Sequence, residues 1–163
     1  MKFIVTSDSH GDFMALRDII LRHNDADVVI FCGDGNKDID DIYYTFPQKM
    51  FISVRGNCDW YCDRNDTQEI TLCGKKIFVT HGHIFGVKQG YQRITQHGHS
   101  INADIVVFGH THQQFLSVDD NMLLLNPGSA GHNRQYATIE IDENSGKIKA
   151  ELYPNSDSGT IIL

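Results

Sequence analysis

The sequence has no hydrophobic run that approaches the roughly 18 to 20 consecutive apolar residues of a transmembrane helix. The chain opens directly on a strand-like segment, residues 3–6, without the apolar region of a signal peptide. We therefore expect a soluble protein that is located in the cytoplasm and has no membrane partner.

Paired cysteines and an excess of positive charge are also missing. The four cysteines, Cys32, Cys58, Cys62 and Cys73, show no paired Cys-x-x-Cys spacing, which argues against a zinc knuckle and a disulfide framework and favours reduced thiols. Lysine and arginine number 14 against 21 aspartate and glutamate residues, so the formal charge is −7. A nucleic-acid binder with a broad basic face is not expected, but a small nucleotide substrate is compatible, since a phosphate responds to local charge.

What the sequence does contain is a series of apolar, β-branched segments. At 163 residues, the chain is long enough for one domain, residues 1–163, that buries about 70% of the surface of its unfolded chain. Predicted strands cover residues 3–6, 28–32, 50–54, 69–73, 76–80, 104–108, 115–118, 122–125, 137–141 and 148–152. Predicted helices follow Asp12 and span residues 38–44, and a helical or mobile segment is expected over about residues 89–99. Because early strands alternate with helices and later ones form hairpins, we expect an α/β architecture of two mixed sheets packed together with helices outside.

Polar side chains follow five of the predicted strands, at the point where each strand ends. They are Asp8, His10, Asp34, Asn57, His81, His110 and His112. The clearest case is Gly109-His110-Thr111-His112, where a buried strand stops at a glycine and two imidazoles follow. Taken singly, such residues cap helices or occupy surface turns. Seven of them at strand ends favour one shared site, because ligands of open α/β sheets bind beyond the carboxyl ends of the strands.

Two carboxylates, one carboxamide and four imidazoles are suitable donors for a metal site. Oxygen and nitrogen donors without thiolate suit Mn²⁺, Fe, Co²⁺, Ni²⁺ or Zn²⁺. One four-coordinate ion cannot use all seven donors, whereas two ions that share a bridging carboxylate can. Two divalent ions with two aspartates would make a cationic pocket in an acidic protein. Paired ions activate water and hold the oxygens of a phosphoester during displacement at phosphorus, so the donor set favours phosphoester hydrolysis.

Five short motifs occur in an order that resembles the calcineurin-like metallophosphoesterases. They are Asp8-x-His10, Gly33-Asp34, Gly56-Asn57, the first histidine of His81-Gly82-His83, and Gly109-His110-x-His112. The segment Asn126-Pro127-Gly128-Ser129 and the small size of the chain are similar to the YfcE-type phosphodiesterases within that superfamily. The resemblance covers about residues 2–141 and implies a four-layer α/β/β/α sandwich of two mixed sheets flanked by helices.

The resemblance also implies which residues bind which ion. It places Asp8, His10, Asp34 and His112 on one divalent ion, and Asn57, His81 and His110 on the other, with Asp34 as the bridge. Mn²⁺ is the expected ion, with Ni²⁺, Fe, Co²⁺ or Zn²⁺ as alternatives. Such a centre is expected to hydrolyse a small phosphodiester by attack of a metal-bridging hydroxide on phosphorus.

One position departs from the commoner motif of the superfamily. Many members carry a histidine after the Gly-Asn pair, oriented by an acidic residue, whereas this chain has Cys58 followed by Asp59. A thiol with an ordinary pKa of about 8.5 replaces an imidazole poorly near neutrality, which leaves the identity of the general acid open. The candidate catalytic residues are Asn57, Cys58, Asp59 and His83, with His132 and Arg134 as further candidates for the acid. His83 has a second interpretation, as a residue that orients His81 or another ligand.

Two other functions stay open. One is a metal-dependent phosphomonoesterase or nuclease, and the other is a non-catalytic scaffold similar to the retromer subunit of this fold, which binds partner proteins. For the phosphodiesterase and for the phosphomonoesterase or nuclease, the expected partner is a small phosphoester substrate. The apolar end Ile161–Leu163 suggests a homo-oligomer contact, and Trp60 and Tyr61 either line a pocket or cover the core.

Overall fold

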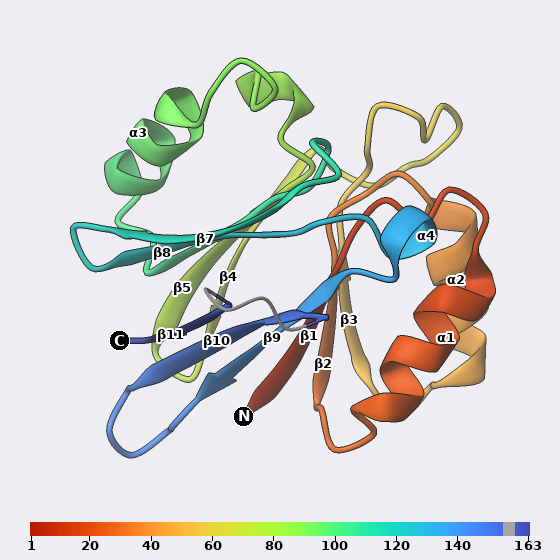
Figure 1. The fold of residues 1–163 in the computed structure, drawn as a ribbon, viewed down its shortest axis with the longest axis horizontal. Coiled ribbons are helices and arrows are strands. Elements are labelled where there is room, and N and C mark those ends of the chain that lie inside the picture. The colour runs from red at the N-terminus through yellow and green to blue at the C-terminus, as the bar shows by residue number, and fades with distance from the viewer. Residues whose placement is uncertain (155–158) are drawn as a thin grey trace.

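The computed structural model describes residues 1–154 and 159–163, which form two mixed β-sheets and their covering helices (Figure 1). The first sheet has the strand order β11-β10-β9-β1-β2-β3, and the second has the order β4-β5-β6-β8-β7. The first sheet comprises β1 (Lys2–Thr6), β2 (Val28–Phe31), β3 (Met50–Ser53), β9 (Tyr136–Ile141), β10 (Ile148–Tyr153) and β11 (Thr160–Ile162). The second comprises β4 (Thr67–Leu72), β5 (Lys75–Thr80), β6 (Ile105–Val107), β7 (Gln114–Asp119) and β8 (Met122–Pro127). The helical elements are α1 (Phe13–Arg22), α2 (Asn36–Thr45), α3 (Gln92–Ser100), α4 (Ala130–Asn133) and the 3₁₀ turn η1 (His83–Phe85).

Three apolar clusters hold these elements in four layers. Phe3 and Val5 of β1 pack between the sheets with residues of β5 and β6, whereas Ile4 packs on the opposite face beneath α1 and α2. A third cluster joins Ile94 of α3 to the outer face of the second sheet. Figure 1 shows α1 and α2 on one side of the sandwich and α3 on the other. The strands are buried on both faces, which explains their continuous apolar sequence. The expected α/β/β/α sandwich is confirmed.

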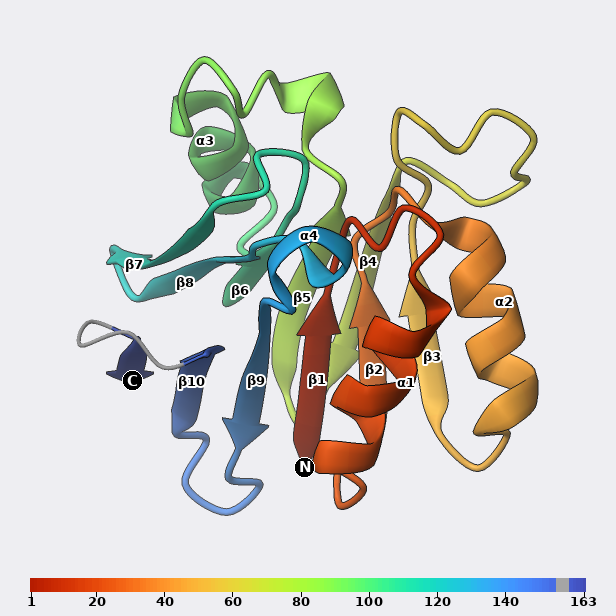
Figure 2. The same cartoon turned by 45° about the vertical axis from the view of Figure 1, so that its right-hand side comes forward.

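The strands that precede the polar motifs share one orientation. In the first sheet β1, β2 and β3 lie side by side and parallel, and in the second sheet β5 and β6 are parallel. The loops that follow these strands lie at the upper end of the sandwich in Figure 2. Both sheets therefore deliver their carboxyl-end loops to one edge, where α/β proteins bind ligands.

The start of α1 follows from the local sequence, whereas the start of α2 depends on hydrogen bonds to a distant residue. Helix α1 begins after Asp12, whose carboxylate accepts a hydrogen bond from the Ala15 N–H at 2.9 Å, as its position before an apolar helical pattern predicts. Helix α2 begins at Asn36, two residues before the expected start, and its first N–H groups donate to the carboxylate of Asp59 on another loop. A cap supplied from so far along the chain leaves no signal in the local sequence. The short elements η1, α4 and β11 were likewise not expected.

The apolar C-terminal end forms an edge strand. β11 pairs antiparallel with β10, and Ile161 and Leu163 pack against the core between the sheets, while Ile162 is exposed. Most of the apolar surface of this end therefore contacts its own chain, and a homo-oligomer contact here stays a prediction.

Two findings bear on the expected environment of the protein. Within residues 1–154 and 159–163, none of the helices combines the length and apolar character that crossing a bilayer requires. The four cysteines all fall in these ranges and are free thiols.

Gly98 sets how closely α3 packs on the second sheet. A Cβ atom at this position would lie 2.6 Å from Met122 Sδ and 2.8 Å from Val106 Cγ2. Although alanine is the better helix former by about 1 kcal/mol, we expect Gly98→Ala to lower the free energy of unfolding by about 1–3 kcal/mol because overpacking dominates. Gln96→Ala on the exposed face of α3 should change it by less than about 0.5 kcal/mol. Denaturant titration measures both, and a Gly98→Ala protein as stable as the parent would contradict the tight packing.

Candidate metal centre

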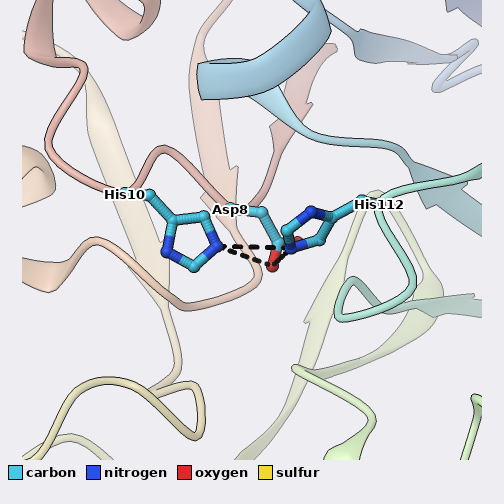
Figure 3. A group of neighbouring side chains, drawn as sticks. All are labelled: Asp8, His10 and His112. Atoms are coloured by element: carbon cyan, nitrogen blue, oxygen red, sulfur yellow. Dashed lines mark hydrogen bonds and ion pairs between the residues drawn. The ribbon is translucent and has the colours of Figure 1, made fainter.

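The first cluster of metal-ligating atoms joins the loop after β1 to the loop after β6 (Figure 3). His112 Nε2 lies 3.0 Å from Asp8 Oδ1 and 3.2 Å from His10 Nε2. His10 Nε2 lies 3.7 Å from the same Asp8 oxygen. The Asp8 side chain is fully buried and both imidazoles are partly exposed. Two imidazole nitrogens therefore face a buried carboxylate oxygen from the solvent side.

The second cluster draws one side chain from each of four loops. His81 Nε2 lies 3.3 Å from Asp34 Oδ2, 3.1 Å from Asn57 Oδ1 and 3.1 Å from His110 Nδ1. The four side chains follow β5, β2, β3 and β6, respectively. His81 is fully buried and Asp34 is nearly so. All seven residues expected to bind metal thus lie in one of two neighbouring clusters.

Asp34 faces both clusters. Its Oδ2 lies 3.3 Å from His81 Nε2 in the second cluster and 4.0 Å from His10 Nε2 in the first. Its Oδ1 accepts a hydrogen bond from the Cys58 N–H at 2.7 Å, which holds the carboxylate in this orientation. Among the seven expected ligands, Asp34 therefore has the position that a bridging ligand requires.

Hydrogen bonds from outside the clusters orient the donor atoms. Ser7 Oγ and the His110 N–H donate to Asp8 Oδ2, so Oδ1 is the oxygen that faces the first cluster. The Cys32 carbonyl lies 2.7 Å from His81 Nδ1 and accepts a hydrogen bond from its N–H group. The other ring nitrogen of His81, Nε2, is left with its lone pair directed at the second cluster, as in metal-binding histidines.

The backbone is strained at most of the expected ligands. Ten described residues other than glycine have a positive φ angle, and half of them are expected ligands: Asp8, His10, Asp34, His110 and His112. This conformation is disfavoured for residues that carry a Cβ atom. Strain of this kind concentrates at functional sites, where the surrounding structure holds it in place. The sharp bends after the strands therefore support a ligand-binding role for these five residues.

Two motif glycines permit the close approach of neighbouring loops. A Cβ atom at Gly56 would overlap Asp34 Oδ1, and a Cβ atom at Gly109 would overlap Ser7 Oγ. Since the overlapped atoms belong to the site itself, neither can move aside without displacing a donor. Glycine before the ligand is thus a packing requirement that lets the strand ends meet.

An unsatisfied buried oxygen tests whether these residues suit a cation. Among the described residues, Asp8 Oδ1 is buried and accepts no hydrogen bond, although His112 Nε2 lies 3.0 Å from it. A buried carboxylate oxygen without a partner is costly. A divalent cation between Asp8, His10 and His112 would satisfy it, and carboxylate, amide and imidazole donors fit such ions. The donor set therefore fits the metal ions that the fold implies.

In the second cluster, Asp34 and His81 shift each other's pKa values. Burial opposes the ionisation of Asp34, but the hydrogen bond and charge of His81 outweigh it and lower the pKa of Asp34. Burial of His81 is likewise outweighed by Asp34 and Asp8, so the pKa of His81 is raised. Burial and the charge of His81 lower the pKa of His110 to about 4. Because His81 has to lose its proton to bind an ion, protons and divalent cations compete here.

The Cys58 thiol lies at the border between the clusters. The Asn57 side-chain amide donates to Cys58 Sγ at 3.2 Å, which leaves the Asn57 oxygen facing the second cluster. Cys58 Sγ also lies within 4.8 Å of ligating atoms of His10 and Asp34. Burial, followed by the carboxylate of Asp34, raises the pKa of the thiol to about 11. Cys58 is therefore protonated near neutral pH in the metal-free chain.

Asp59 holds two ligand-bearing loops together. Its Oδ2 accepts hydrogen bonds from the N–H groups of Asp34 at 2.8 Å and Gly56 at 2.7 Å. Its Oδ1 accepts from the N–H groups of Gly35 and Asn36, both at 3.0 Å. These bonds tie the loop after β2 to the loop after β3 and place a negative charge at the N-terminus of α2. The carboxylate thus orients backbone groups of the site, whereas the resemblance implies that it orients the neighbouring side chain.

The other candidate acids differ in their distance from the clusters. The ring centroid of His83 lies 5.5 Å from that of His81, and the centroid of His132 lies 5.1 Å from that of His112. Each cluster therefore has one additional imidazole beside it. Arg134 instead pairs with carboxylates on and next to α1, so it is drawn away from the donors.

Asn126 and Ser129 support the site although no strand-end donor pattern points to them. The Asn126 side-chain amide donates to the Gly109 carbonyl at 2.8 Å, and Ser129 Oγ donates to the Asp8 carbonyl at 2.8 Å. Both side chains therefore fix the backbone of a ligand-bearing loop. Their signal in the sequence is the segment Asn126-Pro127-Gly128-Ser129, whose role in positioning is visible only in the folded chain.

The sandwich and its paired donor clusters have the fold and chemistry of a metal-dependent phosphoesterase. Comparison with known protein families leads to the same class, because residues 1–144 match the calcineurin-like phosphoesterase superfamily domain. The chain belongs to this superfamily, as the order of its motifs predicts.

Named relatives share this chemistry. The chain is 31% identical over 156 residues to the probable metallophosphoesterase YsnB of Bacillus subtilis, an alignment that covers 91% of this chain and 89% of that protein. It is 26% identical over 171 residues to the phosphodiesterase YfcE of Escherichia coli, which covers 87% of this chain and 89% of that protein. The resemblance to YfcE-type phosphodiesterases is confirmed.

Solved structures extend the likeness in fold. A Streptococcus pneumoniae protein described as a predicted phosphoesterase superposes with a TM-score of 0.81 at 27% identity, over 99% of this chain and 96% of that one. Vps29 from Entamoeba histolytica superposes with a TM-score of 0.76 at 21% identity, over 100% of this chain and 97% of that one. At this identity, the second likeness shows the fold alone.

Replacing Asp59 tests whether its four hydrogen bonds position the metal ligands. Asp59→Asn would direct an NH₂ group at backbone N–H donors, and Asp34 and Asn57 would lose their relative placement. We expect binding of Mn²⁺ to weaken about 10- to 100-fold, measured by isothermal titration calorimetry. Asp66→Asn is a matched control, because the Asp66 carboxylate pairs with Arg55, and it should bind Mn²⁺ as the parent does. Equal weakening in the two variants would argue against a specific role for Asp59.

Proposed function

We propose that the protein is a phosphodiesterase that uses two divalent ions to hydrolyse a small phosphodiester. The observation that carries this proposal is the position of Asp34 Oδ2, which faces His81 Nε2 at 3.3 Å and His10 Nε2 at 4.0 Å. A carboxylate shared by two donor clusters is suited to bridge a pair of ions. The relatives named metallophosphoesterase and phosphodiesterase support phosphoester chemistry.

The two clusters supply the proposed ligands of the two ions. One ion would be held by Asp8, His10, Asp34 and His112, and the other by Asp34, Asn57, His81 and His110. Such ions, when bound, activate water and neutralise the charge of the phosphate. The protein orients these donors through hydrogen bonds to the atoms that do not face the ions. His81 Nδ1 is bonded to the Cys32 carbonyl, and Asp8 Oδ2 accepts from the His110 N–H. Mn²⁺ is the proposed ion, with Ni²⁺, Fe, Co²⁺ or Zn²⁺ as alternatives, because the ligands are oxygen and nitrogen.

Residues at the edges of the clusters are the proposed contacts of the substrate. Cys58 lies beside ligating atoms of His10 and Asp34, so its thiol can donate a weak hydrogen bond to a phosphoryl oxygen when it carries a proton. His83 and Asn57 line a cavity beside the second cluster, where an ester group of the substrate can lie. Asp59 acts through the backbone of the two loops, because both of its carboxylate oxygens accept hydrogen bonds from their N–H groups.

A non-catalytic scaffold is the second candidate, because Vps29 shares the fold. A scaffold has no need for seven metal-binding side chains, yet all seven are present here and their donor atoms converge. The complete donor set therefore favours the enzyme.

We place the protein in the cytoplasm as a single domain of residues 1–163, since its four cysteines are free thiols and typical of a reducing compartment. Its formal charge of −7 favours a small phosphoester over a nucleic acid as the substrate.

Activity and its metal dependence test the proposed function directly. Purified protein supplied with Mn²⁺ or Ni²⁺ is expected to hydrolyse bis(4-nitrophenyl) phosphate, to lose this activity on chelation and to regain it when the ion is restored. Hydrolysis of 4-nitrophenyl phosphate and single-stranded DNA should be slower under the same conditions. Faster turnover of the monoester or of DNA would replace the proposal with a phosphomonoesterase or a nuclease. No turnover with any of the five metals, together with no bound metal by elemental analysis, would favour the scaffold.

His110 and His112 lie two residues apart in the same motif but face different clusters. His110 Nδ1 faces His81, whereas His112 Nε2 faces Asp8. We expect His110→Ala and His112→Ala each to retain one tightly bound ion and lose the other, so elemental analysis should find about half of the parent's metal content. His99→Ala is the control, because His99 pairs with a carboxylate on β7 outside both clusters. Complete loss of metal from either site variant would contradict the assignment of separate ions.

A further inference from the structure

A cavity opens beside the second cluster, between η1 and the loop that joins β3 to β4. Its volume is about 370 Å³, which is within the range of small-molecule sites. Its lining includes Arg55, Asn57, Trp60, Asp66, His83 and Ile84. Both segments lie at the end of the sandwich that carries the metal ligands (Figures 1 and 2). Because Asn57 belongs to the cavity and to the cluster, a group attached to a phosphate at the ions can extend into this space.

One wall of the cavity is apolar and open to solvent. Trp60 exposes 83% of its surface and Ile84 exposes 43%, although residues of these types are usually well buried. Trp60 therefore does not cover the core, and of the two roles that the sequence leaves open it has the one of lining a pocket. Trp60 is three residues after the proposed metal ligand Asn57 in the sequence. A flat ligand that stacks on its exposed indole would bury apolar surface of both groups.

The polar wall of the cavity carries no unpaired charge. The Arg55 guanidinium donates from Nε to Asp66 Oδ1 at 2.7 Å and from Nη2 to Asp66 Oδ2 at 3.1 Å, so the two charges pair in a bidentate arrangement. Asp59 is engaged by four backbone N–H groups. His83 Nδ1 is buried and has no hydrogen-bond partner in the described part of the chain. Because these charges are already paired, the wall suits an uncharged group and disfavours a second phosphate.

We propose that this cavity binds the nucleobase of a nucleotide substrate, stacked on Trp60, while the phosphate lies at the metal clusters. A nucleobase is uncharged and planar, which matches a wall formed by an indole and an aliphatic side chain beside charges that are already paired. This inference rests on the proposed function, because it names the substrate class of the same site as phosphodiesters of nucleosides. Trp60 is then a residue that determines specificity.

Fluorescence can test base binding without any turnover. Trp60 is the single tryptophan of the chain, so its emission reports on this cavity alone. We expect adenosine 5′-monophosphate to quench or shift the emission of the Mn²⁺-supplied protein, and ribose 5-phosphate at the same concentration to leave it unchanged. Trp60→Phe provides the background signal. An equal response to both compounds, or none at saturating nucleotide, would overturn the base site.

Two cyclic diesters test the same inference by kinetics. Adenosine 2′,3′-cyclic phosphate and glycerol 1,2-cyclic phosphate share a five-membered cyclic diester, but only the first carries a base. We expect Trp60→Ala to lower kcat/KM for the cyclic nucleotide about tenfold, mainly through KM, as stacking on an aromatic side chain predicts, and to leave the glycerol compound unaffected. Tyr61→Ala is the matched control, because Tyr61 is the next residue, is fully exposed and does not line this cavity. Tyr61→Ala should leave kcat/KM unchanged for both cyclic diesters.

The outcomes separate this inference from the proposed function. If Trp60→Ala slows both cyclic diesters equally, the base site is overturned and the phosphodiesterase stands. If the parent protein hydrolyses no diester but its emission responds to adenosine 5′-monophosphate and not to ribose 5-phosphate, the phosphodiesterase fails and the cavity stands as a nucleotide site.

Discussion

The arrangement of this molecule depends on one electrostatic constraint, which is that two buried aspartates lie among imidazoles. Asp8 and Asp34 are removed from water, and Asp8 Oδ1 accepts no hydrogen bond from the described residues. Buried carboxylates stay ionised only where positive charge or hydrogen-bond donors compensate for lost solvation. Backbone N–H groups of His110 and Cys58 supply part of that compensation. A cation bound by the inward-facing oxygens and imidazole nitrogens would supply the rest of the compensation for the lost solvation.

A surrounding set of hydrogen bonds makes this arrangement possible. Asp59 joins the loops after β2 and β3, and Asn126 and Ser129 fix the loops that carry His110 and Asp8. The donors come from both sheets of the sandwich, so small shifts between the sheets would separate them. Glycines at the strand ends and tight packing between the layers keep the loops close. The strained backbone at the ligands is held by this environment.

Charge is distributed unevenly in a way that bears on substrate choice. The chain is acidic overall, yet the clusters would become locally positive when divalent ions bind. The adjacent cavity, by contrast, has its Arg55 and Asp66 charges paired and offers the indole of Trp60 to a ligand. A positive centre next to a neutral aromatic wall suits a molecule with one phosphate and one flat, uncharged group.

The sequence by itself determined every described strand except β11, the two-sheet architecture and seven candidate metal donors, because apolar periodicity and strand-end motifs are local features that burial on both sheet faces enforces. It also singled out Cys58 as a departure from the superfamily, but not that its backbone N–H orients Asp34. Only the tertiary structure decided that Asp59 caps α2 and links two loops, that Asp34 faces both clusters, and that Trp60 lines a cavity. These relationships join residues on separate strands and loops. Local propensity cannot encode them, because the distances between such residues exist only once the sheets have packed.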